Sequence, residues 1–413
     1  MVDSIRSENP ARGVARALRM GLVLAVLGVL AFAWRQEMRF DGEYGLVVFI
    51  ERDTLEVRWL TGQAGAGMLE IAPGPGGTPV RVLTPSSFRH QVRVPLPRQD
   101  EVVLTYGREE PPAAQHRTVV SLRAPSRAPP QLPAVDSLYI IGDTHGMLTE
   151  LQAGMRGAGL IDSAGHWSGG RRHVVFAGDL LDRGPDVLPL LWFVYRLERE
   201  AAHHGGGVHT LLGNHEIMVL LGDLRYVHGR ERHVAELHDL PYDRMFNVRT
   251  SLLGRWLASR PALMRIGRVL IAHGGVAPEM TFGSVAQVND TLAAYMSEDL
   301  FHYWADTTKV ITIDSLSYQR REDFFWDSSS LFWHRAFVQA DTLGAQLDSV
   351  LRHFDSDVLV VGHTPVDTSG VRYDGRLIAA HTPQYGAEFV LLVRAPQGLQ
   401  RFRVRSDGTT TPF

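Results

Sequence analysis

Five short apolar segments in the later two thirds of the chain each end directly before a glycine or a histidine. They are residues 138–141, 174–177, 208–212, 269–272 and 358–361. Apolar runs of this length, rich in branched side chains and bounded by glycine, are typical of strands buried inside a sheet. Between them, residues 147–158 and 186–203 carry apolar residues at helical spacing. Strands that alternate with helices predict an α/β domain over residues 136–405.

The region before this domain has the alternating pattern of exposed strands. Residues 55–59 and 88–94 alternate apolar and polar positions, and residues 44–50, 79–83, 102–106 and 118–123 are further candidate strands. Short strands separated by Gly/Pro turns predict a small all-β sandwich domain at 40–123, which resembles fibronectin-type or immunoglobulin-like domains without their cysteine pair. The glycine-rich residues 62–77 predict a flexible loop in it.

Three further segments complete the expected organisation. The proline-rich residues 124–135 predict an extended linker. Residues 224–265 are expected to be mostly helical and to cover the site, and residues 306–330 to be an irregular insertion. Strands are expected again at 376–380, 388–393 and 399–404.

The chain begins with a basic segment followed by an uncharged apolar run at residues 20–34. This run is shorter than the roughly 20 residues of a membrane-spanning helix and fits the core of a signal peptide, with a small-X-small cleavage pattern at 31–33. Residues 1–35 are therefore either a cleaved signal peptide or a short uncleaved anchor, and both interpretations stay open. Basic residues before the run predict export, to the periplasm or to attachment at the inner membrane.

Composition excludes several classes of function. A net charge of −3 argues against a general nucleic-acid binder, which needs a basic surface. The chain has no cysteine, which excludes disulfides, thiolate metal sites and cysteine-based phosphatase chemistry. At 413 residues, with 45% hydrophobic and 21% charged residues, the chain can form two ordinary globular domains.

Polar residues directly after the five strands carry the candidate chemistry. The segments are GDTHG (142–146), GDLLDRG (178–184), GNHE (213–216), HGG (273–275) and GHTP (362–365). Ligands of open α/β folds bind beyond the carboxyl ends of strands, so these side chains fall where a site is expected. A salt-bridged turn would explain GDLLDRG alone, but it would not explain five segments of the same kind. Carboxylate, amide and imidazole groups without sulfur suit manganese, iron or zinc.

These five motifs, in this order, resemble the phosphoprotein phosphatase branch of the calcineurin-like metallophosphoesterases. The run LLGNHEIMVLLGDLRY at 211–226 is similar to the narrower group of bacterial Shewanella-like phosphatases. The resemblance covers about residues 136–395. It implies a four-layer αββα sandwich and two metal ions that clamp the attacking and leaving oxygens of a phosphoryl transfer.

The resemblance also implies a role for each motif residue. Asp143 and His145 would hold the first metal ion, Asp179 would bridge both ions, and the second ion would be completed by Asn214, His273 and His363. Asn214 also favours phosphate binding, because a third carboxylate in its place would cancel the positive charge that attracts the dianion.

The remaining implied roles concern the substrate. His215 would protonate the leaving alkoxide, oriented by Asp182, and Arg183 would bind phosphate as a fork. Arg335 resembles a second phosphate contact, although serines at 328–330 stand where Gly-Pro is usual. A second departure is AAHT at 379–382, where the family has Asp-X-Gly. His381 there either supports the metal ligands from outside or faces solvent, and the sequence leaves both open.

The expected function is therefore a metal-dependent phosphomonoesterase, in which a hydroxide activated by two metal ions attacks phosphorus in line. Its expected substrate is a phosphorylated protein, on serine, threonine or tyrosine. One alternative is a small-molecule phosphatase or dinucleoside-polyphosphate hydrolase, with a small phosphomonoester or dinucleotide as substrate. The other is a non-catalytic exported binding protein whose β domain recognises a partner.

Overall fold

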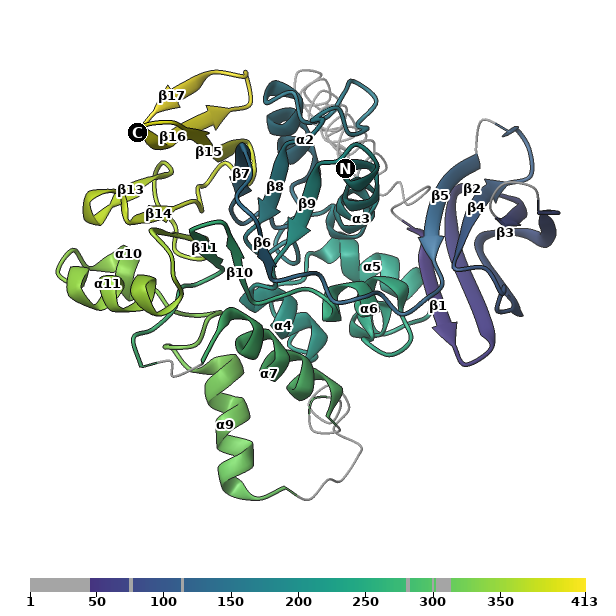
Figure 1. Cartoon of the computed structure of the whole chain (residues 1–413). Helices are drawn as coiled ribbons and strands as arrows, with labels where there is room; N and C mark the ends of the chain where they lie inside the picture. The colour runs from purple at the N-terminus through teal and green to yellow at the C-terminus, as the bar shows by residue number, and fades with distance from the viewer. Residues whose placement is uncertain (1–44, 74–76, 113–114, 280–282, 299–300, 302–312) are drawn as a thin grey trace, which may run out of the picture. The chain divides into compact units, whose positions relative to one another are not determined.

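The computed structural model in Figure 1 describes residues 45–73, 77–112, 115–279, 283–298, 301 and 313–413. The predicted signal peptide or anchor at 1–35 lies outside these residues. The strands are β1 (Val47–Glu51), β2 (Thr54–Pro73), β3 (Val80–Pro95), β4 (Glu101–Arg108), β5 (Gln115–Ser121), β6 (Gln131–Leu132), β7 (Ser137–Ile141), β8 (His173–Phe176), β9 (Gly207–Thr210), β10 (Leu263–Ile266), β11 (Val269–Ala272), β12 (Val358–Val361), β13 (Gly370–Arg372), β14 (Leu377–Ala379), β15 (Glu388–Ala395), β16 (Gly398–Arg405) and β17 (Thr410–Pro412).

The helices lie in the later part of the described chain. They are α2 (Leu148–Gly157), α3 (Val187–His203), α4 (Asn214–Leu220), α5 (Gly229–Leu237), α6 (Leu252–Ala258), α7 (Val285–Ser297), α9 (Ser315–Trp326), α10 (Ala336–Gln339) and α11 (Gly344–His353), with 3₁₀ turns η3 (Tyr242–Phe246) and η4 (Tyr373–Gly375). None of the helices in this part of the chain is both long and apolar enough to cross a bilayer.

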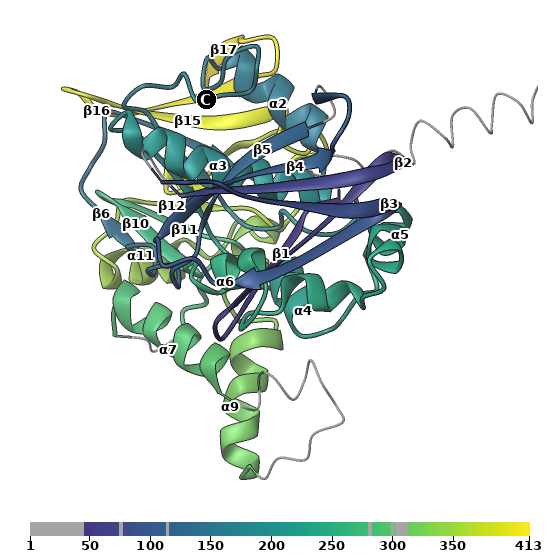
Figure 2. The ribbon, with the colours of Figure 1, turned by 90° about the vertical axis from the view of Figure 1, so that its right-hand side faces the viewer.

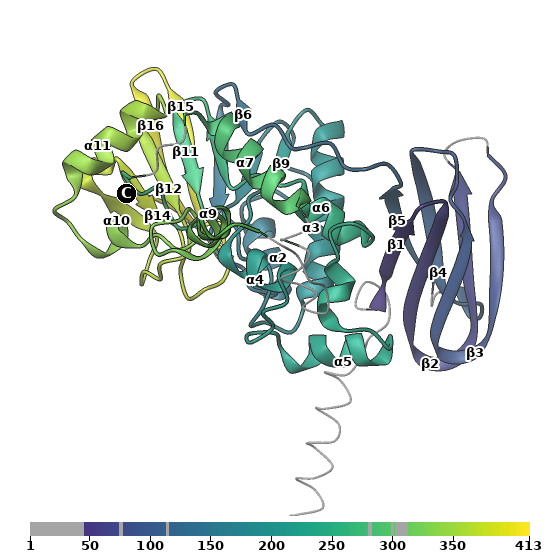
Figure 3. The same ribbon diagram turned by 90° about the horizontal axis from the view of Figure 1, so that it is seen from below.

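The β1–β5 region is built on the long antiparallel pair β2 and β3, which Figure 3 shows side by side. β1 pairs with the first part of β2, whereas β4 pairs with its last part and β5 continues from β4. The indole of Trp59, in the first part of β2, donates a hydrogen bond to the Gly107 carbonyl of β4 at 3.1 Å. This bond joins the two parts of the bent sheet over a core that includes Leu55, Val57 and Leu104, all fully buried.

The glycine-rich stretch at 62–77 is not the flexible loop that its composition predicts. As far as Pro73 it belongs to β2, and residues 74–76 lie outside the described part. The pairing with β3 shifts register around Gly65 and Gly67. A Cβ atom on Gly67 would lie 2.3 Å from the ring of His90 and 2.4 Å from Thr84 Oγ1. The glycine is therefore needed for close approach of two strands, a use that composition does not distinguish from a loop.

Two six-stranded sheets form the rest of the fold (Figures 1 and 2). One, called here the β7 sheet, has the order β17-β16-β15-β7-β8-β9, and the other, the β11 sheet, has the order β13-β14-β12-β11-β10-β6. β7, β8 and β9 are mutually parallel, as are β11, β12 and β14. The predicted linker contributes β6, which pairs in parallel with β10.

A hydrophobic core joins the two sheets. It is formed by Leu138, Ile140, Val175, Ala177, Leu211, Met264, Ile266, Val269, Ile271, Val358, Val360, Ile378, Ala380, Val390 and Leu392. Helices α2 and α3 contact the β7 sheet, and α7 contacts β10 of the β11 sheet. The layers are helix, sheet, sheet and helix, which confirms the predicted fold class.

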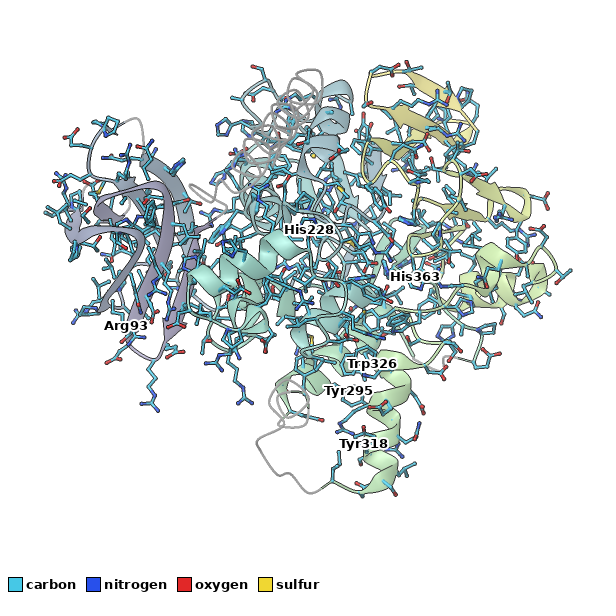
Figure 4. All side chains as sticks on the ribbon, turned by 180° about the vertical axis from the view of Figure 1, so that it is seen from behind. Arg93, His228, Tyr295, Tyr318, Trp326 and His363 are labelled. Atoms are coloured by element: carbon cyan, nitrogen blue, oxygen red, sulfur yellow. The ribbon has the colours of Figure 1, made fainter. Side chains whose placement is uncertain are left out.

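The expectation of an irregular insertion at 306–330 is wrong for the part that the structure describes. Residues 302–312 lie outside that part, but Ser315–Trp326 form the regular helix α9. The Asp314 side chain accepts a hydrogen bond from Ser317 N and begins the helix, while Phe325 is fully buried at its end. Figure 4 labels Tyr318 and Trp326 along this helix.

Candidate active site

Glycines at the strand ends bring the polar loops into contact. Gly178 follows β8 with φ of 98°, and a Cβ on it would lie 2.7 Å from the backbone of Gly213. A Cβ on Gly213 would lie 2.2 Å from Asp179 Oδ1. Without side chains at these two positions, the loops after β8 and β9 approach closely enough for their polar residues to share one site.

The loops also hold non-glycine residues in the left-handed region of backbone space. Five of the motif residues have positive φ: His145 (45°), Asp179 (55°), Asp182 (67°), Arg183 (63°) and His363 (58°). Each such residue costs of order 1–3 kcal/mol and persists only where the surrounding structure imposes it. Their concentration in three of the predicted motifs marks this edge of the sheets as a functional site.

The two carboxylates are oriented by backbone N–H groups. Asp143 Oδ1 accepts a hydrogen bond from His363 N, and Asp179 Oδ1 accepts one from His215 N, both at 2.9 Å. The second oxygen of each carboxylate stays directed toward the histidines. Oδ2 of Asp179 lies 3.2 Å from His273 Nε2 and 3.7 Å from His145 Nε2.

Two of the histidines are oriented by backbone carbonyls. His145 donates from Nδ1 to the Leu181 carbonyl, and His273 donates from Nδ1 to the Ala177 carbonyl, both at 2.8 Å. These bonds leave Nε2 of each ring facing the carboxylates, where its lone pair would be available to a metal ion. Metal-binding histidines are held in this way, with one nitrogen on a backbone or carboxylate oxygen and the other on the ion.

The donor set fits metal ions. Nε2 of His145 and of His363 is buried without a hydrogen-bond partner, although such atoms are normally satisfied. Ligand atoms of Asp179, His273 and His363 lie within 4.8 Å of one another, as do those of His145, Asp179 and His215. Asn214 Oδ1 lies 2.9 Å from His273 Nε2. The six residues predicted as ligands thus come together at one edge of the two sheets.

The carboxylates of the site attract positive charge. Burial alone would lower the pKa of His273, but Asp179 outweighs this effect and raises that pKa to about 9. The neighbouring ring of His363, 5.0 Å away, has a pKa lowered to about 2 by burial and by the charge of His273. One cation is therefore favoured between these rings, at the position where a metal ion would take the nitrogen of His273.

His215, Asp182 and Arg183 form a separate group beside Asp179, with His215 Nε2 3.9 Å from Asp179 Oδ2. Nδ1 of His215 lies 2.7 Å from Asp182 Oδ2, and its Nε2 lies 3.3 Å from Arg183 Nη2. His215 and Asp182 are buried, whereas Arg183 is exposed. Burial alone would lower the pKa of His215, but Asp179 and the bond to Asp182 raise it above its ordinary value. The His215 ring can therefore carry a proton at Nε2, the nitrogen that is not bonded to Asp182.

Arg335 and His381, near which the sequence departs from the family pattern, both lie at the site. The half-buried Arg335 donates to the His363 carbonyl at 3.2 Å, and its charge interacts with Asp143 and Asp179. His381 is buried, with Nδ1 3.2 Å from Asp143 Oδ2, so it does not face solvent. The backbone of His363, which Figure 4 labels, accepts the bond from Arg335 and donates one to Asp143, the carboxylate beside His381.

Glu216 has a role that the sequence analysis did not assign. One of its oxygens accepts from Asp179 N and Gly213 N, and the other from Leu180 N and Leu181 N, over 2.7–3.1 Å. The side chain thus fixes the loop after β8 onto the start of α4. The sequence feature that could have identified this role is the position of Glu216 three residues after Gly213, which is the spacing of a capping box at a helix start.

A family model described as calcineurin-like phosphoesterase matches residues 137–391. The chain belongs to this family. The match contains the segment after each of the five predicted strands, so it confirms the resemblance stated from the motifs. Metallophosphoesterases of this family bind two metal ions and hydrolyse phosphoesters, and this protein is accordingly a phosphoester hydrolase.

The structure is similar to solved structures of a cold-active protein-tyrosine phosphatase of a psychrophilic Shewanella species. In one of them, the similarity covers 89% of this chain and 97% of that chain, with a TM-score of 0.66 and 26% identity. A second, at 1.1 Å resolution, gives a TM-score of 0.65 and 27% identity over 89% of this chain and 95% of that chain.

Relatives in sequence include proteins named as protein phosphatases and proteins named as bis(5'-nucleosyl)-tetraphosphatases. Shewanella-like protein phosphatase 2 of Arabidopsis thaliana is 49% identical over 92 residues, 22% of this chain and 24% of that protein. Shewanella-like protein phosphatase 1 of Plasmodium berghei is 25% identical over 55% of this chain and 60% of its own length. An asymmetrical bis(5'-nucleosyl)-tetraphosphatase of Oceanobacillus iheyensis is 28% identical over 38% of this chain and 62% of its own length. Each of these three alignments spans less than two thirds of the relative.

Proposed function

We propose that this protein is a two-metal phosphomonoesterase that removes phosphate from phosphorylated proteins. The observation that carries the proposal is the His215–Asp182–Arg183 group, which lies beside the carboxylate that both ions would share. The proposal is supported further by the likeness to the Shewanella tyrosine phosphatase over 89% of this chain.

The ligand assignment follows the motifs. Asp143 and His145 would hold one ion, Asp179 would bridge, and the other ion would take Asn214, His273 and His363. Two ions held by such a set would supply Lewis-acid charge for the phosphoryl oxygens and a water acidified toward neutral pH. Two carboxylates offset only part of the charge of two divalent ions, so the site attracts a phosphate dianion.

The chain's own residues would perform the other tasks. Arg183 and Arg335 bind the phosphate oxygens from two sides and hold phosphorus in line with the attacking water. A phosphate bound to Arg183 has its leaving oxygen near His215 Nε2, since these side chains lie 3.3 Å apart. His215 donates its proton to that oxygen, and Asp182 stabilises the imidazolium and fixes its orientation.

The surroundings of His215 favour an aromatic leaving group. Tyr226 is 48% exposed, its ring centroid lies 5.2 Å from that of His215, and it contacts the guanidinium of Arg183 at 5.9 Å and that of Arg225 at 5.7 Å. An exposed ring beside the proton donor is a stacking surface for the departing group. Phosphotyrosine is therefore the preferred substrate among phosphorylated side chains.

The test compares three substrates on the metal-loaded protein: a phosphotyrosine peptide, the matched phosphoserine peptide and diadenosine tetraphosphate. The phosphotyrosine peptide is expected to have the highest kcat/KM, and Tyr226→Ala should lower that value about tenfold with little effect on the phosphoserine peptide. His215→Asn should abolish most turnover of both peptides, whereas the exposed control His204→Asn should not.

Two results would contradict this proposal. Faster hydrolysis of diadenosine tetraphosphate than of either peptide would favour the dinucleotide alternative, for which the Oceanobacillus relative is an argument. A protein that binds metal and phosphopeptides but hydrolyses neither of the two peptides would support a recognition function instead.

We also propose that the enzyme works outside the cytosol, on the basis of the apolar run at 20–34 and the arginines before it. Cell fractionation tests this directly. Full-length protein recovered in the cytosolic fraction would contradict it and would leave the catalytic proposal intact.

A further inference from the structure

His381 lies where the ends of the two sheets meet. It follows β14 by two residues, and the N–H of the preceding Ala380 donates to the Val361 carbonyl of β12 at 2.8 Å. Across the interface, a Cβ on Gly142 would lie 2.3 Å from the Ala380 carbonyl oxygen. This close approach places His381 beside Asp143, the residue that follows Gly142, and only 3% of His381 is exposed.

The Nδ1 atom of His381 faces the Asp143 carboxylate without bonding to it. The atom lies 3.2 Å from Asp143 Oδ2, is buried, and has no hydrogen-bond partner among the described residues. Oδ2 is the oxygen that the His363 N–H leaves free, because that N–H is bonded to Oδ1. The same Oδ2 lies 3.8 Å from Nε2 of His145, which also lacks a partner.

These distances match those between neighbouring ligands of one ion. Nitrogen and oxygen ligands lie about 2.0–2.2 Å from a transition metal, so adjacent ligand atoms are separated by roughly 3–4 Å. A histidine that only oriented Asp143 would instead direct its N–H at the carboxylate oxygen in a hydrogen bond. Nδ1 of His381 and Nε2 of His145 are thus both unpartnered, and each lies within ligand-to-ligand distance of the same carboxylate oxygen.

We infer that His381 binds the first metal ion directly through Nδ1, together with Asp143, His145 and Asp179. The inference rests on the metal centre of the proposed function. It gives each ion four protein ligands, since the second ion has Asp179, Asn214, His273 and His363. A neutral imidazole adds a ligand without adding negative charge, so the attraction of the site for phosphate is kept.

The experiment uses cobalt(II) on full-length protein stripped with a chelator. Calorimetric titration gives the affinity of each site, and proton NMR of the cobalt-loaded protein shows strongly shifted, solvent-exchangeable N–H signals from imidazoles bound directly to cobalt. The variants are His381→Phe, which removes the nitrogen, and His381→Asn, whose amide can place an oxygen near the position of Nδ1. The control is His238→Asn, because His238 is equally buried, with an unpartnered Nδ1, but its ring bonds to the Gly45 carbonyl.

The expected result is a loss of at least tenfold in affinity at one site for His381→Phe, a smaller loss for His381→Asn, and one shifted N–H signal missing from both. The other site and the control should be unchanged. Two bound ions with every shifted signal retained in both variants would overturn the inference and leave the proposed function standing, even if affinity fell. A wild-type protein that takes up no cobalt would contradict the proposed function itself.

Discussion

The charge of His215 is controlled by two carboxylates on opposite sides of its ring. Nδ1 lies 2.7 Å from Asp182 Oδ2, and Nε2 lies 3.9 Å from Asp179 Oδ2. Both interactions favour the protonated ring, and together they outweigh burial, which disfavours it. The residue is thus prepared to act as an acid in a place where an isolated histidine would be neutral.

Asp182→Asn should shift the pH dependence of turnover. Loss of the charge and of the charged hydrogen bond lowers the pKa of His215, so the ring loses its proton at lower pH than in the wild type. The alkaline limb of the kcat profile should therefore move to lower pH, with kcat reduced by about 10²–10⁴. Profiles measured with an alkyl and an aryl phosphate test this, because the poorer alkyl leaving group depends more on protonation. An unmoved alkaline limb would show that Asp182 does not control this proton.

At the scale of the elements, the loop after β8 is held against the start of α4. This contact depends on Glu216, whose two oxygens accept four backbone hydrogen bonds inside the protein. Burial and the nearby Asp179 raise the pKa of Glu216 to about 7, while the N–H groups act in the opposite direction. The bonds that hold the loop therefore also keep this carboxyl ionisable.

Glu216→Gln should weaken the fold as well as the site. The amide keeps one oxygen but turns its NH₂ group toward two N–H donors, and each buried donor left unpaired costs about 1–3 kcal/mol. The free energy of unfolding should fall by roughly 2–6 kcal/mol in urea titrations with chelator present, which removes any effect of metal. Glu236→Gln, at a side chain that is 73% exposed, is the control and should change stability little. Equal stability of both variants would contradict the role of Glu216.

Helix α3 begins against another buried acid. Glu231 of α5 accepts from Leu188 N at 3.4 Å, and burial raises its pKa from 4.5 to about 8. A pKa raised in the folded state means that stability is fully present below the unfolded pKa and is lost as pH rises through about 8. The free energy of unfolding lost through this ionisation reaches up to ~5 kcal/mol once the titration is complete.

Glu231→Gln should remove this dependence. Between pH 5 and pH 9, the wild type should lose stability relative to the variant, with the change concentrated below and around pH 8. Urea unfolding at several pH values measures it. A difference between the two proteins that stays constant with pH would show that Glu231 is already ionised in the folded state.

The sequence predicted the elements whose signals are local. Uninterrupted apolar runs such as 174–177 and 358–361 identified buried strands, and the residues after them identified the site, because ligands of open α/β folds bind beyond the carboxyl ends of the strands. Strand pairing through Gly67 was missed, since its cause is the ring of His90, 23 positions away in sequence. Helix α9 was missed because its pattern is weakly amphipathic and its buried residues cluster at one end.

Prediction of the site stopped where roles depend on contacts between loops. The roles of Asp143, Asp179 and His215 were implied by the family resemblance of their motifs, but the bonds of Glu216 link four backbone positions in two loops to one side chain. The sequence left His381 between two roles, because its position depends on the close approach of Gly142 to β14. Distances of this kind are set by tertiary packing rather than by local pattern.

At the scale of the whole molecule, the site joins the two sheets. Asp143, Asp179 and Asn214 follow strands of the β7 sheet, while His273 and His363 follow strands of the β11 sheet. Ions bound between them would link the carboxyl ends of both sheets and neutralise buried carboxylates. Metal binding should therefore stabilise the entire α/β domain and not the loops alone.

Chelation should lower the melting temperature accordingly. At one hundred times its Kd, each ion stabilises the folded state by about 2.7 kcal/mol, and each kcal/mol corresponds to about 2–4 °C for a domain of this size. Calorimetry with and without chelator should show a drop of roughly 5–20 °C that manganese reverses. His215→Asn should keep the same drop, because His215 is not assigned as a ligand. An unchanged melting temperature would contradict a site that links both sheets.

The five left-handed residues of the loops have an evolutionary consequence. Glycine at any of these five positions would remove the backbone strain. Selection for thermal stability alone would therefore favour replacing the five residues by glycine, and the enzyme would lose its site residues in the process. A laboratory lineage grown hot without need for turnover should accumulate glycine here first. Retention of the five non-glycine residues in natural relatives would thus indicate that the activity has remained under selection.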